Sequence, residues 1–311
     1  MFDVAVSQLT SPRWELAEEL QAAVVHGFDA IALWRPKVTD LGVAATARLL
    51  GATGVRGSSL QWAGGFTGSD GRTFVDGIDD ATEAITAAAT LGTPVLVVHS
   101  GCRGGHTRSH AARLLVEALD TLAPVASRHG VTLAVRPIHA VAAPGCSFLT
   151  CLREAVDLVE SLADPAVRLA VDLWQFADDP AFEDLVPRLA AAAAIVQVAD
   201  RRGPPTAEGD RQPAGQGMLP LEQAVGLLVD HGFSGTFEID PVGEAVELAG
   251  YEGVWRETRR IVDAWAGRLA GPRPAGYLQG VGIAGDAADR YRSAATGSRR
   301  SHASSHTVSP G

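Results

Sequence analysis

The chain has 311 residues, of which 46% are hydrophobic, and carries a net charge of −10 at pH 7. That charge argues against nucleic acid or an anionic membrane surface as a partner. No apolar run reaches the roughly 18 residues of a membrane-spanning helix, and the N-terminus, MFDVAVSQ, lacks the basic residues of a secretory leader. The three cysteines have no metal-site spacing. We therefore expect a cytoplasmic protein with a small-molecule substrate, and homo-oligomerisation stays open.

Strand and helix patterns alternate along most of the chain. Strands are predicted near 3–8, 29–34, 55–60, 94–99, 131–136, 168–172, 194–199 and 235–239. Helices are predicted near 13–26, 40–52, 75–91, 107–129, 150–162, 181–192, 220–231 and 249–268, the first of them capped by Ser11 with Pro12 at its first position. Eight such units predict one (β/α)₈ TIM barrel over residues 1–270. A doubly wound sheet is the alternative, but it rarely needs eight regular units.

The amino-acid composition of the chain changes after the last predicted helix. Gly271-Pro272-Arg273-Pro274 breaks that helix, and residues 287–311 are rich in Ser, Ala, Gly, Arg and His. Such a composition has little apolar surface to bury. Residues 271–311 are therefore predicted to form a flexible, largely disordered tail.

Polar residues follow the apolar strands at the end where α/β barrels bind ligands. The stretch VTLAVRPIHA, residues 131–140, ends its strand at Arg136, which Pro137 holds in an extended conformation. The other strand ends are Gln8, Trp34, Gln61-Trp62, His99, Asp172, Gln197 and Glu238. Buried groups of this kind need hydrogen-bonding partners, a ligand or a metal. Oxygen donors at Asp172, Gln197 and Glu238 suit Mg²⁺ or Mn²⁺, whereas Arg136 paired with Asp172 or Glu238 would make a metal-free polar plug.

Several segments, in their order along the chain, resemble a known family. They are LVVHSGCRGGH, LAVRPIHA, LAVDLWQ, IVQVAD, DRQPAGQGMLPL and GTFEID. They are similar to the xylose-isomerase-like TIM barrels called sugar phosphate isomerases/epimerases, over roughly residues 1–268. The resemblance implies a divalent metal held by Glu, Asp, His or Gln, and Glu, with two Glu side chains that move a proton next to a carbonyl. It places Asp172, Gln197 and Glu238 at metal positions and Arg211 at a substrate-contacting position.

Arg136 departs from the family pattern, because it stands where the fifth-strand glutamate is expected. The change removes a metal ligand and one of the two acid/base groups. A guanidinium and a cation about 4 Å apart repel by about 4 kcal/mol at an effective dielectric near 20, and arginine cannot lose its proton. We therefore expect a degenerate site that binds no metal, or binds Mg²⁺ or Mn²⁺ weakly. Arg136 can instead hold a carboxylate, phosphate or enolate oxygen.

The remaining candidates are assigned by their positions near strand ends. Glu238, His99 and Arg136 are the predicted catalytic residues. Predicted substrate-binding residues are Trp34, Trp62, His106, His139 and Arg211, and Lys37 is interpreted as a solvated loop residue. The predicted function is an isomerase/epimerase-like enzyme that moves a proton next to a carbonyl in a small polyhydroxylated or carbonyl substrate. A lyase or dehydratase on the same barrel, and a binding protein that has lost turnover, are the alternatives.

Overall fold

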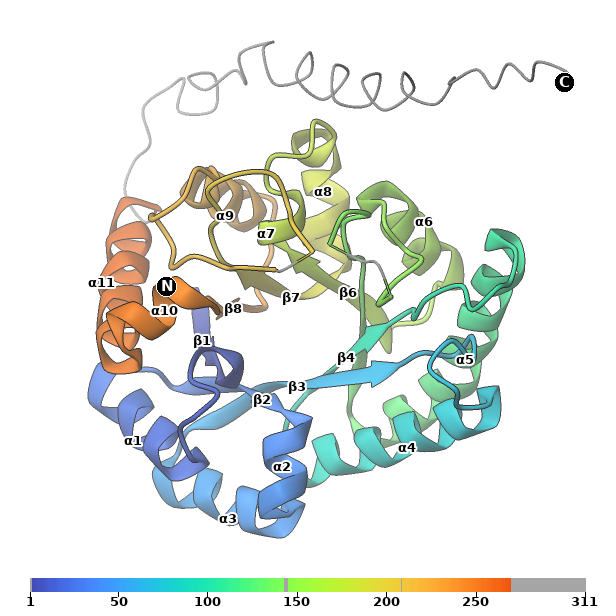
Figure 1. Cartoon of the computed structure of the whole chain (residues 1–311), viewed down its shortest axis with the longest axis horizontal. Coiled ribbons are helices and arrows are strands. Elements are labelled where there is room, and N and C mark those ends of the chain that lie inside the picture. The colour runs from blue at the N-terminus through green and yellow to red at the C-terminus, as the bar shows by residue number, and fades with distance from the viewer. Residues whose placement is uncertain (1, 143–144, 208, 270–311) are drawn as a thin grey trace, which may run out of the picture. The chain divides into compact units, whose positions relative to one another are not determined.

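The computed structural model describes residues 2–142, 145–207 and 209–269. Eight parallel strands close into a barrel in chain order, each hydrogen-bonded to the next and the last to the first (Figure 1). They are β1 Asp3–Ser7, β2 Ala30–Trp34, β3 Arg56–Gly64, β4 Val95–His99, β5 Thr132–Arg136, β6 Val167–Asp172, β7 Ala193–Val198 and β8 Thr236–Ile239. All eight predicted strands, and the single barrel, are confirmed.

Helices follow the strands and surround the barrel (Figure 1). They are η1 Gln8–Thr10, α1 Leu16–His26, α2 Arg35–Leu41, α3 Val43–Thr53, α4 Phe74–Thr90, α5 Arg108–His129, α6 Leu152–Leu162, α7 Leu173–Phe176, α8 Phe182–Ala192, α9 Leu221–Asp230, α10 Glu244–Ala249 and α11 Tyr251–Leu269. Residues 1–270 make one compact unit. The predicted tail, residues 271–311, lies outside the described residues. No helix in the described part is long and apolar enough to cross a membrane.

The start of the first helix was predicted wrongly. Ser11 does not cap it: its buried hydroxyl donates to Glu19 Oε1 at 2.8 Å. The helix begins instead at Leu16, where Glu15 and Glu18 form a capping box. The short helices α2, α7 and α10 were not predicted. Strand β3 runs four residues beyond its predicted end at residue 60, so Trp62 lies within it.

The barrel interior changes from apolar to polar along the strands. Val95, Val97, Ala134, Ala170 and Ile195 form a small apolar cluster there, separate from the main core between the strands and the helices. Strand pairing sets Asp172 opposite Gln197, Gln197 opposite Glu238, and His99 opposite Arg136. Residues paired across adjacent strands point to the same side of a sheet. The closed register therefore gathers these polar side chains inside the barrel.

Candidate functional site

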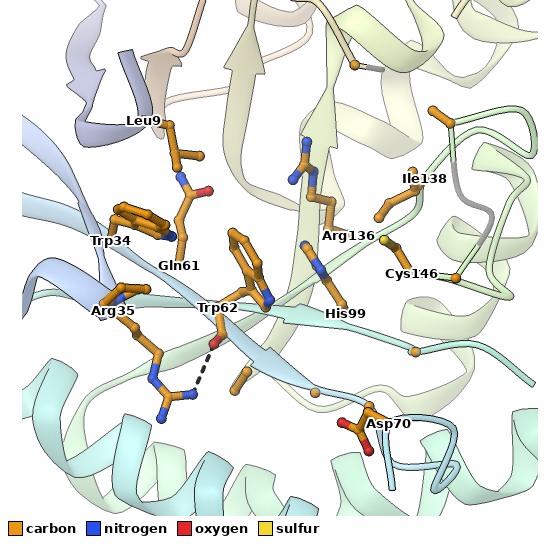
Figure 2. A pocket seen from close by; sticks show the side chains of 18 of the residues that line it. Leu9, Trp34, Arg35, Gln61, Trp62, Asp70, His99, Arg136, Ile138 and Cys146 are labelled. Carbon is orange, nitrogen blue, oxygen red and sulfur yellow. Dashed lines mark hydrogen bonds between the residues drawn. The ribbon is translucent and has the colours of Figure 1, made fainter. Parts of the chain in front are cut away.

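A cavity of about 860 Å³ opens at the carboxyl ends of the strands. Five predicted site residues line it: Trp34, Trp62, His99, Arg136 and Arg211. Figure 2 shows Trp62, His99 and Arg136 projecting from neighbouring strands, with Trp34 and Gln61 beside them. A concave site of this size with a few polar groups is typical of small-molecule binding.

Asp172 is the centre of a buried ion-pair network in the cavity wall. Arg136 Nη2 donates to Asp172 Oδ2 at 2.5 Å, while Arg211 donates to both carboxylate oxygens at 3.0 and 2.9 Å. Arg211 Nη2 also donates to Asp240 Oδ1 at 2.7 Å. The Arg211 guanidinium carbon lies over the Trp174 ring, 5.3 Å from the ring centroid. Of the two predicted partners of Arg136, Asp172 and Glu238, the ion pair is with Asp172. Arg211 and Asp240 extend that pair into a chain of four alternating charges.

Burial and the neighbouring charges shift the pKa values of Asp172, Arg211 and Asp240. Burial acts to raise the pKa of Asp172, but the adjacent Arg211 and Arg136 guanidiniums lower it well below its ordinary value. Burial raises the pKa of Asp240 to about 6, against the opposing effect of Arg211. Burial acts to lower the pKa of Arg211, but its two carboxylate partners raise it. Asp172 is therefore a permanent anion, whereas Asp240 can exchange a proton near neutral pH.

Glu238 lies beneath the cavity rather than in its lining. Its side chain is fully buried and accepts hydrogen bonds from Ser58 Oγ at 2.7 Å and from Gln61 Nε2 at 3.2 Å. Burial raises the pKa of Glu238 to about 7. Gln61 lines the cavity and separates it from Glu238. A ligand in the cavity therefore meets Gln61 first.

Asp172, one of the three predicted metal ligands, is not free to bind a divalent ion. Asp172 accepts three hydrogen bonds from two arginines and a fourth from the Trp174 backbone N–H at 3.1 Å, so both its oxygens are committed. Among the described residues, no three His, Cys, Asp or Glu side chains come together as a metal site would require. Gln197 is buried opposite Glu238, and its side-chain hydrogen bond to that carboxyl acts to lower the pKa of Glu238.

His99 and Trp62 form a stacked pair at the cavity wall. Their rings lie 5.1 Å apart with an interplanar angle of 15°. Burial, reinforced by the Arg136 charge, lowers the pKa of His99 to about 3. His99 is therefore a neutral imidazole at pH 7, able to donate or accept a hydrogen bond but carrying no charge. Trp62 is 42% exposed and presents an open aromatic face beside it.

Three other predicted residues lie outside the cavity lining. His106 contacts the Thr67 carbonyl oxygen at 3.1 Å and packs on His110. His139 donates its backbone N–H to Gln175, and its side chain is half-buried. Lys37 is not a solvated loop residue, because α2 contains it and its ammonium donates to Ser11 O, Trp14 O and Glu19 Oε1 at 2.7–2.8 Å. That geometry uses all three ammonium protons, so Lys37 has a structural role.

Asp240 is one of the cavity residues that sequence reasoning missed; Arg35, Asp70, Arg72 and Asp80 are others. Asp240 follows β8 and is 3% exposed, and it lines the cavity. The signal was available: side chains alternate along a strand, so Asp240 shares the inward face with Glu238, whereas Ile239 packs in the outer core. Asp240 would have been predicted if the alternation of side chains had been continued one residue beyond the predicted strand, 235–239.

These features define an α/β barrel with a polar ligand cavity at the carboxyl ends of its strands. The chain belongs to the family described as xylose isomerase-like TIM barrel, whose model matches residues 20–264. No curated protein sequence matches the chain significantly.

Solved structures share this fold across most of the chain. Protein SMc04130 from Sinorhizobium meliloti 1021 superposes with a TM-score of 0.78 at 25% identity, covering 84% of this chain and 97% of that one. The IOLI protein with a bound zinc atom gives 0.76 at 17% identity, covering 87% and 100%. The 3-keto-D-glucoside 4-epimerase YcjR from E. coli gives 0.71 at 13% identity, covering 85% and 100%. At the lower identities the likeness establishes the fold alone.

Proposed function

We propose that this protein is an isomerase- or epimerase-like enzyme that moves a proton at the carbon next to a carbonyl in a small polyhydroxylated substrate. Family membership and the fold it shares with an epimerase support the class of reaction. The observation that carries the proposal is Arg136, a fixed guanidinium in the cavity wall beside a neutral His99. This pair supplies a permanent positive charge where negative charge develops in such a reaction.

Arg136 holds the developing oxyanion. Within the described residues its one hydrogen bond goes from Nη2 to Asp172, and its Nε is buried. An arginine has five N–H donors, so those on Nη1 are free for a ligand oxygen. Removing the α-proton shifts charge onto the carbonyl oxygen, and a preorganised donor there stabilises the transition state more than the ground state. Asp172 fixes the guanidinium in place before the substrate arrives.

Asp240 is the proposed base. Its Oδ1 is held by Arg211, and its Oδ2 makes no hydrogen bond in the described part of the chain. With a pKa raised to about 6 by burial, it is mostly ionised at pH 7 and still basic enough to take a proton. Neutral His99 polarises the carbonyl or passes a proton between neighbouring oxygens, as an uncharged imidazole can. Glu238 remains a predicted acid/base group, and Gln61 separates it from the cavity.

The arrangement also suits a binding protein without turnover, and one observation favours that alternative. The ion pair with Arg211 stabilises the charged form of Asp240 and so weakens it as a base. The two functions differ in whether bound ligand exchanges its α-proton with solvent. A lyase would share the proton abstraction and then break a bond.

Proton exchange tests the proposal directly. The protein is incubated in D₂O with a panel of ketoses and cyclic polyol ketones, and deuterium next to the carbonyl is followed by NMR. We expect exchange with at least one ligand, lowered about 10²–10³-fold in Arg136→Ala, as for loss of an oxyanion donor. Asp240→Asn should also lose exchange, while Asp263→Asn, on the surface of α11, should retain it. Ligands that bind without exchange would establish a binding protein, and full exchange in Arg136→Ala would refute the role of Arg136.

A further inference from the structure

The outer half of the cavity carries a second charged network. Arg35, at the start of α2, donates to both oxygens of Asp80 on α4 at 3.0 and 2.8 Å. It also donates to the Trp62 carbonyl oxygen at 3.0 Å (Figure 2). Arg72, between β3 and α4, donates to Asp70 Oδ2 through Nε at 2.8 Å and through Nη2 at 2.6 Å. Its Nη1 lies 3.1 Å from Asp80 Oδ2. Asp80 therefore joins the two arginines, and all four side chains line the cavity.

Every arginine in the cavity lining already has a carboxylate partner. Arg35 and Arg72 pair with Asp80 and Asp70, while the inner arginines pair with Asp172 and Asp240. Asp40 adds a further carboxylate to the lining, without an arginine partner among the described residues. In the outer half of the cavity, a phosphate group, which carries between one and two negative charges at neutral pH, would therefore meet guanidiniums already paired with carboxylates. A hydroxyl group, in contrast, can hydrogen-bond to either member of such a pair.

The place where TIM barrels often bind phosphate, the loops after the seventh and eighth strands, is also filled. The buried Asp200 carboxylate accepts the backbone N–H groups of Arg201, Leu219 and Gly215 at 2.8, 3.0 and 3.1 Å. The short helix after β8, α10, carries Glu244 and Glu247 in its first turn. The protein's own carboxylates therefore take the backbone donors of this loop and place negative charge at this helix start.

We propose that Asp70 and Asp80 are selectivity residues: they keep Arg72 and Arg35 from binding phosphate, so that the cavity takes an uncharged polyhydroxylated ligand and rejects its phosphate ester. This inference rests on the proposed function, because it takes the cavity to be the substrate site. It narrows the proposed substrates to those that carry no phosphate group. Asp70 and Asp80 are 39% and 28% exposed at their side chains, so substituting them leaves the core intact.

The test is calorimetric titration of inorganic phosphate into the full chain. Asp80→Asn removes one charge and leaves Arg35 without a carboxylate partner among the described residues, whereas Asp70→Asn removes one charge and leaves Arg72 paired with Asp80 alone. Asp40→Asn removes one charge from the same lining and frees no arginine. We expect no measurable phosphate binding in the wild type or in Asp40→Asn, and affinities at least about tenfold above the wild-type limit in the other two. Adding Arg35→Ala to the Asp80→Asn variant should abolish its gain.

Two results would overturn the inference. The first is phosphate binding by the wild type as tight as that of the Asn variants. The second is a phosphate affinity in Asp80→Asn no higher than that in Asp40→Asn, which would mean that a released arginine does not set selectivity. The D₂O exchange assay, run with ketohexoses and their 6-phosphates, separates this inference from the function itself. Faster exchange with the 6-phosphates would refute the selectivity but not the proposed function. No exchange with either kind of ligand would refute the proposed function, and the phosphate titration would still test the roles of Asp70 and Asp80.

Discussion

Replacing Asp172 by Asn tests the ion-pair network at its centre. Asp172 is 0% exposed, and Arg136 has no other carboxylate partner among the described residues, whereas Arg211 would keep Asp240. Breaking a buried pair by removing one partner costs about 3–5 kcal/mol, because it leaves an uncompensated buried charge. At about 2–4 °C per kcal/mol for a domain of this size, the thermal midpoint should fall by about 6–20 °C.

The assay is thermal unfolding followed by circular dichroism, with Asp263→Asn as the matched control. Asp263 pairs with Arg259 on the surface of α11, and its side chain is 55% exposed. Loss of a surface pair should cost no more than about 1 kcal/mol. A midpoint for Asp172→Asn as high as that of Asp263→Asn would refute the reasoning. It would mean that the buried pairs contribute no more than a surface pair does.

Three further predictions follow from other parts of the chain. Because burial raises the pKa of Glu238 from 4.5 to about 7, the folded state binds the proton more tightly, so the free energy of unfolding should fall as pH rises through this range. Urea unfolding at several pH values should show this slope in the wild type and a smaller one in Glu238→Gln, where Asp240 still contributes; an unchanged slope would contradict the assignment. Lys37→Met should lower the free energy of unfolding by about 3–5 kcal/mol, measured with urea, because it leaves the buried Glu19 carboxylate without its cation. A loss within about 1 kcal/mol would mean that the three contacts of the Lys37 ammonium contribute little to stability. A chain ending at residue 270 should keep the thermal midpoint of the full chain, and a large loss would show that residues 271–311 stabilise the barrel.

The strands were predictable because each is a short apolar run in a buried parallel sheet, and that pattern is local. The short helices were not. Arg35-Pro36-Lys37 begins α2 with proline in its first turn, but seven residues give too little periodicity to distinguish a helix from a loop. The first helix was misplaced because Ser11 was expected to cap a backbone N–H, whereas its hydroxyl binds Glu19, eight residues away. A tertiary contact thus overrode a local signal.

The site was predictable in part, for the same reason. Arg136 and Asp172 end adjacent strands, so strand order brings the two side chains to the same end of the barrel. The double pairing of Asp172 depends on Arg211, which is 39 residues further along in a long loop, and no periodicity places a loop side chain. Glu238 was placed at the correct strand position, but its depth depends on Ser58 and Gln61, which enclose it from β3.

We propose that the Arg136 guanidinium, held by Asp172, takes the position of a metal ligand in this site. The most direct test of this proposal is calorimetric titration of Mn²⁺ into the wild type, Arg136→Glu and Arg136→Ala, after dialysis against a chelator. The account predicts weak or no binding in the wild type and in Arg136→Ala, because neither supplies the missing carboxylate, and a clear gain of affinity in Arg136→Glu. Equally tight binding in the wild type and Arg136→Ala would contradict it, because Arg136 would then have no part in excluding the ion.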